Sequence, residues 1–369
     1  MSKIDEYRLA FSMLSPMNIK IARAILQRVG SEREFFELPT PQLRAVVGSR
    51  SRLNDEDRRA TALEKARREQ PFIDSPSVRP VYFTDDEYPE RLINCDDAPT
   101  LLYMIGDCRL NGIPTVSIVG TRHATPYGIS CAEKIVERLA ERVGDIVIVS
   151  GLAYGIDVAA HRAALRCGLP TVAVMAQPLN TIYPAEHRDV AARIAKNGGA
   201  LISEYSTADP VHKGNFLARN RIVAGLSDVT IVVESDRRGG AMSTARIASA
   251  YNRSVCAVPG RTVDQYSRGC NHLIAMSIAR LIQSADDVID EAGWPTRPVE
   301  GEQQQIKLIL RDEQKNILEL LNTNPEYTVN DMAVRLGMRF NELTDLLVEM
   351  EMDGLVTAIP GGRYAILPT

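Results

Sequence analysis

The 369-residue sequence lacks the features that mark membrane and secreted proteins. No apolar run approaches the roughly 18 residues that a membrane-spanning helix needs. The first residues, Met1 to Glu6, contain no apolar core of a signal peptide. We therefore expect a cytoplasmic protein with no membrane segment.

The sequence also lacks the common signatures of metal and nucleotide sites. Its six cysteines contain no Cys-x-x-Cys pair, which indicates buried thiols in a reducing compartment. Its five histidines are scattered, so we expect no metal site and no cofactor. Neither a Gly-x-x-x-x-Gly-Lys-[Ser/Thr] loop nor a Gly-x-Gly-x-x-Gly run is present, which argues against ATP hydrolysis and a standard dinucleotide site.

The net charge of the chain does not favour binding of a polyanion such as DNA. A nucleic-acid-binding protein often carries a basic excess, whereas here 43 Lys and Arg face 47 Asp and Glu, a net charge of −4. With 45% hydrophobic and 24% charged residues, the composition is that of an ordinary globular protein. Any polyanion must therefore be held by a local basic cluster.

The pattern of helices and strands predicts an α/β protein with two flanking domains. Residues 1–75 contain short helical segments separated by Gly30, Pro39, Gly48 and Pro71, which predicts a small all-α domain. Within residues 76–290, apolar strands alternate with helices from about residue 114 onward. This alternation predicts a parallel sheet with helices on both faces.

The C-terminal part has the outline of a winged helix-turn-helix. Residues 291–304 have the composition of a linker, and residues 305–369 contain three helical segments followed by a hairpin around Gly361 and Gly362. The expected recognition helix, residues 341–353, carries five acidic residues and no Lys or Arg. DNA phosphates would repel such a helix, so we expect this domain to contact protein.

Three glycine-containing loops follow predicted strands and precede predicted helices. They are residues 120–122 (Gly-Thr-Arg), Ser150 with Gly151, and residues 239–244. Ligands of an open parallel sheet bind at the carboxyl ends of its strands. Glycine lets a backbone approach a phosphate, the free N–H groups of a helix start bind the anion, and Arg122 adds a charged fork. Tight turns alone explain one such loop, but three together favour an anion-binding edge.

The segment around Phe216 adds an aromatic ring and two arginines. On a helix, Phe216, Arg219 and Asn220 share one face, where the ring could stack a base beside a bound phosphate. Arg221 points elsewhere, toward a second phosphate, an acid or a partner subunit. An amphipathic helix with exposed arginines is the alternative explanation. Together with the three loops, the segment favours single-stranded nucleic acid, whose bases are free to stack.

Other candidates for chemistry are weaker. Asp157 and His161 lie four residues apart and could form an acid/base pair, although a capping carboxylate and a structural histidine are more common. Ser150 is not part of a Gly-x-Ser-x-Gly elbow, so a hydrolase triad is not indicated. Lys213 could contact a phosphate or simply be solvated.

Residues 80–285 resemble the DprA/Smf family. Motifs that occur in the order typical of that family are Ser117–Arg122, Ser150–Asp157 with His161, Tyr183-Pro184, Ser203-Glu204, Phe216–Ser227, Gly240–Thr244 and Pro259-Gly260. The helical front module is similar to the family's sterile-alpha-motif-like domain, and the tail to its optional winged-helix domain. The resemblance implies a Rossmann-like core that binds single-stranded DNA without sequence preference.

The resemblance also implies partners and site residues. Such proteins are not enzymes; they protect incoming DNA during natural transformation, load the RecA recombinase and form homodimers through the Rossmann-like domain. The implied DNA-binding residues are Gly120, Thr121, Arg122, Ser150, Gly151, Lys213, Phe216, Arg219, Asn220, Arg221, Gly240, Ser243, Thr244 and Asn271. The motif that contains Asn271 departs from the family pattern at Ser277-Ile278, where the family has Gly-Ala.

Two other functions stay open at this point. Gly239-Gly240 at a helix start is similar to the loop of phosphoribohydrolases on a related Rossmann-like sheet, although Thr244-Ala-Arg246 lacks the acidic residue that their chemistry uses. Release of free base from a nucleoside monophosphate would identify such an enzyme. A winged-helix transcription regulator is the second alternative, and its sign would be preference for a specific duplex sequence.

Overall fold

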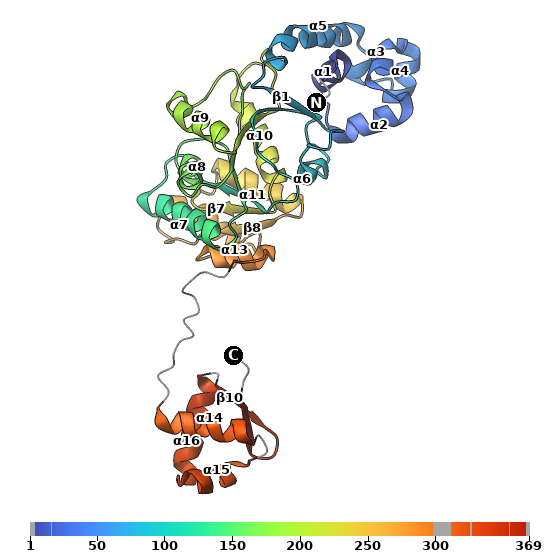
Figure 1. Ribbon diagram of the computed structural model, residues 1–369. Helices are drawn as coiled ribbons and strands as arrows, with labels where there is room; N and C mark the ends of the chain where they lie inside the picture. Colours follow the sequence, from blue (N-terminus) through green and yellow to red (C-terminus); the bar gives the residue numbers. More distant parts are fainter. Residues whose placement is uncertain (1–3, 16, 298–310, 325–326, 354, 367–369) are drawn as a thin grey trace. The chain divides into compact units, whose positions relative to one another are not determined.

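The computed structural model describes residues 4–15, 17–297, 311–324, 327–353 and 355–366. They belong to two compact units, Met1–Arg297 and Pro298–Thr369 (Figure 1). The predicted boundary between residues 75 and 76 lies inside the first unit, and residues 298–304 of the predicted linker lie outside the described residues. Within the described ranges, no helix is long and apolar enough to cross a membrane.

The first unit begins with the predicted all-α region. Four of its helices start where the side chain of Asp5, Asn18, Ser31 or Asp55 accepts a hydrogen bond from a backbone N–H of the first turn. The rings of Phe11 and Phe35 pack edge to face at 5.0 Å in the core of this region. The elements are α1 (Glu6–Ser12), α2 (Ile19–Val29), α3 (Glu32–Glu37), α4 (Thr40–Val47), η1 (Arg52–Asn54) and α5 (Glu56–Ile73).

A nine-stranded sheet follows, in the order β1-β2-β6-β5-β4-β3-β7-β8-β9. The strands from β6 to β9 pair in parallel, whereas β1–β2 and β2–β6 are antiparallel. The predicted parallel sheet is confirmed, and the two strands before residue 114 form its antiparallel edge. The strands are β1 (Arg79–Tyr82), β2 (Leu101–Gly106), β3 (Thr115–Val119), β4 (Val147–Ser150), β5 (Thr171–Val174), β6 (Ala200–Ser203), β7 (Val229–Val232), β8 (Ser254–Ala257) and β9 (Arg280–Leu281).

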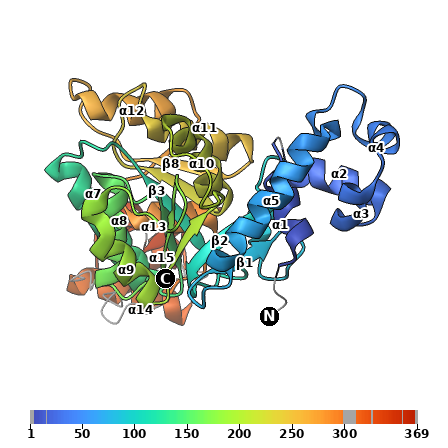
Figure 2. The ribbon, with the colours of Figure 1, turned by 90° about the horizontal axis from the view of Figure 1, so that it is seen from above.

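Helices cover both faces of the sheet, as the alternating pattern predicts (Figure 2). Val116 and Ile118 of β3 face α7, α8 and α13, whereas Val149 of β4 and Val172 of β5 belong to the core under α10 and α11. The helices are α6 (Glu90–Ile93), α7 (Pro126–Arg142), α8 (Ile156–Arg166), η2 (Ala185–His187), α9 (Arg188–Lys196), α10 (Lys213–Gly225), α11 (Gly240–Ala250), η3 (Gln265–Ser267), α12 (Arg268–Ala275) and α13 (Ala285–Ala292).

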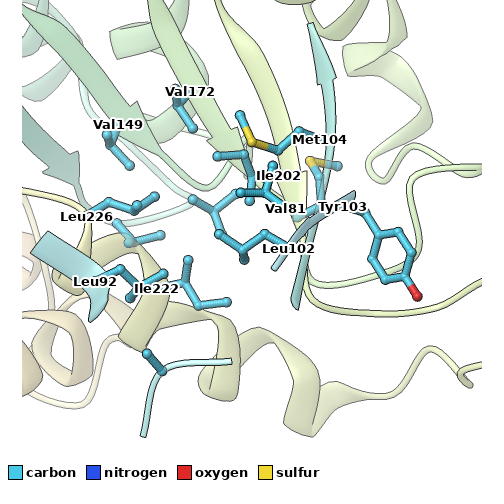
Figure 3. Packing of buried hydrophobic residues seen from close by; sticks show 14 of the residues in the cluster. Val81, Leu92, Leu102, Tyr103, Met104, Val149, Val172, Ile202, Ile222 and Leu226 are labelled. Carbon is cyan, nitrogen blue, oxygen red and sulfur yellow. The ribbon is translucent and has the colours of Figure 1, made fainter. Parts of the chain in front are cut away.

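The larger core joins the antiparallel edge to the parallel strands. Figure 3 shows Leu102 of β2 and Ile202 of β6 in the same cluster as Ile222 and Leu226, which come from α10 and its C-terminal end. All four side chains are nearly or fully buried. The helix that carries Phe216 is therefore anchored at its C-terminal half by hydrophobic burial, which fixes where its N-terminal half lies.

The second unit has the predicted three helices and hairpin. Ile317, Leu343, Leu347 and Val356 form its buried core. Its elements are α14 (Asp312–Thr323), α15 (Val329–Leu336), α16 (Phe340–Met352), β10 (Val356–Ile359) and β11 (Arg363–Ile366). Helix α16 is the predicted recognition helix. Its acidic residues Glu342, Asp345 and Glu349 are exposed, as is Asp353 directly after the helix, and Glu349 pairs with Arg311.

Candidate nucleic-acid interface

A cleft of about 320 Å³ lies at the carboxyl ends of the central strands. Strand β3 has β4 on one side and β7 on the other, so the chain order reverses beside β3. Such a switch point leaves a crevice at the strand ends in open α/β sheets. The loops after β3, β4 and β7 all contribute to this cleft, as the three glycine-containing loops predict.

The structure brings nine of the fourteen predicted residues together here. Those that line the cleft are Gly120, Thr121, Arg122, Gly151, Phe216, Arg219, Asn220, Gly240 and Thr244. His123, Ala153, Asp157 and Leu217 also line it but were not predicted as DNA contacts. His123 and Leu217 lie next to predicted residues, so chain neighbourhood could have identified them.

The structure places the other five predicted residues elsewhere. Ser150 is fully buried and its hydroxyl donates to the carbonyl of Ile118 at 2.6 Å, so it offers no group to a ligand. Arg221 pairs with the carboxylate of Glu204, which fits the expectation that it meets an acid. Asn271 exchanges hydrogen bonds with the backbone of Gly260, whereas Lys213 and Ser243 do not line the cleft. Lys213 is exposed at the start of α10.

An exposed arginine and a half-buried ring form the open wall of the cleft. The guanidinium carbon of Arg122 lies 5.3 Å from the centre of the Phe216 ring. Tyr183 packs edge to face against the same ring at 5.6 Å and is 50% exposed. A guanidinium in this position can bind a phosphate, and the aromatic faces beside it can stack on a base, so the two DNA contacts stay a prediction.

Arg219 points inward, which the helical-face argument did not predict. It is 5% exposed, and its Nη1 donates to the carbonyl of Gly151 at 2.8 Å and to that of Val174. Burial is the main cause that lowers the pKa of Arg219, while the nearby Asp157 carboxylate raises it. Arg219 therefore holds the loop after β4 in place. A phosphate contact by this residue stays a prediction.

At two of the predicted glycines, neighbouring atoms of the protein leave no room for a side chain. A Cβ on Gly151 would lie 2.2 Å from Nη1 of Arg219, and one on Gly120 would lie 2.4 Å from the Ile156 side chain. A Cβ on Gly240 meets nothing within 4 Å. Gly240 begins α11, whose start has no side-chain cap. The N–H of Met242 donates to the carbonyl of Gly239, whereas the N–H groups of Gly240 and Ala241 at the helix start can bind an anion.

Glu234 fixes the loop that carries Arg122. Its backbone carbonyl accepts from the N–H of Thr121 at 2.7 Å, and its side chain accepts from the N–H of Thr125 at 2.9 Å. Glu234 is 3% exposed, so these bonds are shielded from water. These bonds tie the loop to the end of β7, and a loop positioned by the protein itself would lower the entropy cost of binding a ligand.

Asp157 and His161 of α8 have different hydrogen-bond partners. Asp157 faces the cleft, accepts a hydrogen bond from the N–H of Ala153 at 3.4 Å, and has a pKa raised by burial. His161 is fully buried, and its Nδ1 donates to the Thr171 hydroxyl at 2.7 Å, because that hydroxyl donates its own proton to Ile148. His161 therefore has a structural role, linking α8 to strand β5, as expected of a structural histidine and not of an acid/base pair.

We expect His161 to make the protein less stable in acid. Burial lowers its pKa from 6.5 to about 3, so between these values the unfolded chain binds a proton that the folded chain does not. As the pH falls from 6.5 to about 3, the free energy of unfolding should therefore decrease, by up to about 1.4 kcal/mol per pH unit. Urea denaturation of wild type and His161→Asn at several pH values measures this. Parallel profiles for the two proteins would contradict the assignment.

Comparison with known proteins identifies relatives of both units. The family model of DNA recombination-mediator protein A matches residues 79–293, and that of the DprA winged helix domain matches residues 302–362. The chain is 35% identical over 298 residues to the putative DNA processing protein DprA of Mycobacterium tuberculosis, covering 77% of this chain and 75% of that one.

Two solved structures share its fold. The DNA processing protein A of Streptococcus pneumoniae matches with a TM-score of 0.65 and 32% identity, covering 79% of this chain and 99% of that one. DNA processing protein A of Helicobacter pylori matches with a TM-score of 0.52 and 34% identity, covering 58% and 94%. The latter structure was described for its single-stranded DNA binding mode.

Proposed function

Because this chain belongs to the DNA recombination-mediator protein A family, we propose that it binds single-stranded DNA in the cytoplasm without sequence preference. The observation that carries the proposal is the cleft at the switch point, where Arg122 lies over Phe216 beside the uncapped start of α11. These groups recognise phosphates and base faces, which every DNA sequence presents. The Helicobacter pylori relative, which binds single-stranded DNA, supports the same ligand.

The test is binding of labelled oligo-dT and of a matching duplex at two salt concentrations. We expect tight, salt-sensitive binding with preference for the single strand. Absence of binding to both by the folded protein would refute the proposal. Preference for the duplex would instead favour a winged-helix regulator.

Arg122→Ala should weaken single-strand binding and lower its salt dependence. Loss of one phosphate contact lowers the slope of log affinity against log salt by about 0.7 for a single strand. The matched control is Arg166→Ala at the far end of α8, an exposed arginine paired with Glu133. An equal change of slope in both variants would mean that Arg122 acts only through overall charge.

We propose further that the protein protects incoming DNA and loads a RecA recombinase, and that it works as a homodimer through the Rossmann-like domain. The support is the family resemblance of motifs across residues 80–285. Assembly of RecA on a single strand covered by a single-strand-binding protein tests the loading role, and sedimentation tests the dimer. Unchanged RecA assembly in the presence of the protein would refute loading.

We propose that the cleft performs no catalysis. Its one acidic lining residue among those described, Asp157, is buried and holds the backbone of the loop after β4. Incubation with nucleoside monophosphates should release no free base, which is the product expected of a phosphoribohydrolase. Base release that is lost in Asp157→Asn would support the enzyme.

We propose that the C-terminal domain contacts protein. Helix α16 presents exposed carboxylates and, at its end, the 85%-exposed Met352. Phosphate would be repelled by such a surface, whereas a protein partner can cover it. Deletion of residues 305–369 should leave most of the single-strand affinity. Loss of that affinity in the folded truncated chain would contradict the proposal.

A further inference from the structure

The row of loops at the carboxyl ends of the strands continues beyond the cleft, to the loop after β8. In the sheet, β8 is the next neighbour of β7, so the loop after β8 lies beside the loop after β7. The loop after β7 carries Arg237 and Arg238 directly before Gly239, which lines the cleft. The loop after β8 carries Arg261, and Arg268 begins α12. All four arginines are exposed. The chain as a whole, by contrast, has a net charge of −4.

Nearby acids compensate these arginines only in part. The same two loops hold three acidic residues against the four arginines. Glu234 is buried and its carboxylate accepts hydrogen bonds from Thr125, so only Asp236 and Asp264 reach the surface beside the arginines. Asp236 is held by Gln265, whose side-chain amide donates to its carboxylate at 2.9 Å. Arg237 lies 3.0 Å from the Nδ1 atom of His272, which leaves its other donor groups open to a ligand. A net positive surface therefore continues from the cleft.

An aromatic pair connects the cleft to η3, which follows the loop after β8. His123 is exposed and lines the cleft, and its ring stacks on Tyr266 of η3 with centres 6.3 Å apart and planes 22° apart. The backbone carbonyl of Tyr266 accepts from the N–H of Ser235 at 2.6 Å, which ties η3 to the end of β7. Stacked rings beside arginines are the combination that binds a nucleic acid strand without reading its sequence.

We propose that a single strand held in the cleft continues across His123 and Tyr266, and that its next phosphates contact Arg237, Arg238 and Arg261. This inference rests on the proposed function, because the same strand occupies both places. It gives the protein a longer binding track than the cleft alone. Affinity should therefore grow with strand length beyond the few nucleotides that the cleft holds.

The test compares oligo-dT of about 5 nucleotides with oligo-dT of about 15 nucleotides, a range that covers known single-strand site sizes. The variant is Arg237→Ala/Arg238→Ala. The matched control is Arg162→Ala/Arg166→Ala, which removes two exposed arginines from the part of α8 that runs away from the cleft. We expect the first double variant to bind the short strand as wild type does and to lose most of the gain on the long strand.

The salt dependence of binding predicts how strongly the Arg237→Ala/Arg238→Ala variant should differ from wild type on the long strand. Loss of two phosphate contacts lowers the log–log slope for the long strand by about 1.4, so between about 50 and about 200 mM salt wild type should lose about sevenfold more affinity than the variant. Tyr266→Ala should also reduce the long-strand gain, whereas Tyr266→Phe, which keeps a ring, should preserve it.

The outcomes separate the two proposals. Absence of short-strand binding by wild type would refute the proposed function itself. Normal short-strand binding with no gain on the longer strand, or with a gain that survives in Arg237→Ala/Arg238→Ala, would overturn the extended track alone. An equal loss in the α8 control would show that overall charge, and not this surface, produces the gain.

Discussion

Arg219→Met should lower the free energy of unfolding by about 3–5 kcal/mol, the usual effect of leaving a buried charge without its compensating charge. The guanidinium is buried, and the substitution leaves the carbonyls of Gly151 and Val174 without their donor. It also leaves Asp157 without the positive charge that lowers its pKa against the effect of burial. Urea denaturation at neutral pH measures the change.

Lys213→Met is the matched control for Arg219→Met. It removes one positive charge from the same helix at an exposed position, so stability should change by no more than about 0.5 kcal/mol. Arg219→Met/Asp157→Asn should recover part of the loss, because it removes the buried charge that the single variant strands. If Arg219→Met keeps wild-type stability but loses DNA binding, Arg219 contacts phosphate and the framework role is wrong.

The sequence predicted most of the fold because local and global signals agree in this chain. Apolar strands followed by glycine turns and helices have few arrangements other than a parallel sheet, and their strand ends must share an edge. This reasoning placed Arg122 and the start of α11 at one edge of the sheet, and the family resemblance added Phe216; the structure has all three in one cleft.

The direction of individual side chains could not be predicted from helical spacing. Phe216 and Arg219 lie three residues apart on α10, yet only Phe216 reaches the open wall. The difference arises from the loop after β4, where Gly151 leaves room for a guanidinium to bind backbone carbonyls. Ser150 shows the same limit, since its hydroxyl satisfies the carbonyl of the neighbouring strand. Both outcomes depend on long-range contacts that no spacing encodes.

Phe216→Ala should weaken single-strand binding by about 1–3 kcal/mol for each base that stacks on the ring, which is about five- to 150-fold. The salt slope should stay unchanged, because a ring carries no charge to exchange for counterions. Leu217→Ala is the matched control: Leu217 is the next residue, lines the same cleft and is 57% exposed, but offers no aromatic face. Phe216→Tyr should retain most of the affinity.

The salt slope also separates stacking from a purely structural effect of the ring. Phe216 lies against both Arg122 and Tyr183, so its removal could displace the arginine. If displacement is the cause, Phe216→Ala should lower the salt slope by about 0.7, as Arg122→Ala does. An unchanged slope with weaker binding identifies stacking. Wild-type affinity in a Phe216→Ala variant of unchanged melting temperature would refute the stacking role, and the remaining aromatic faces, Tyr183 first, would then have to hold the base.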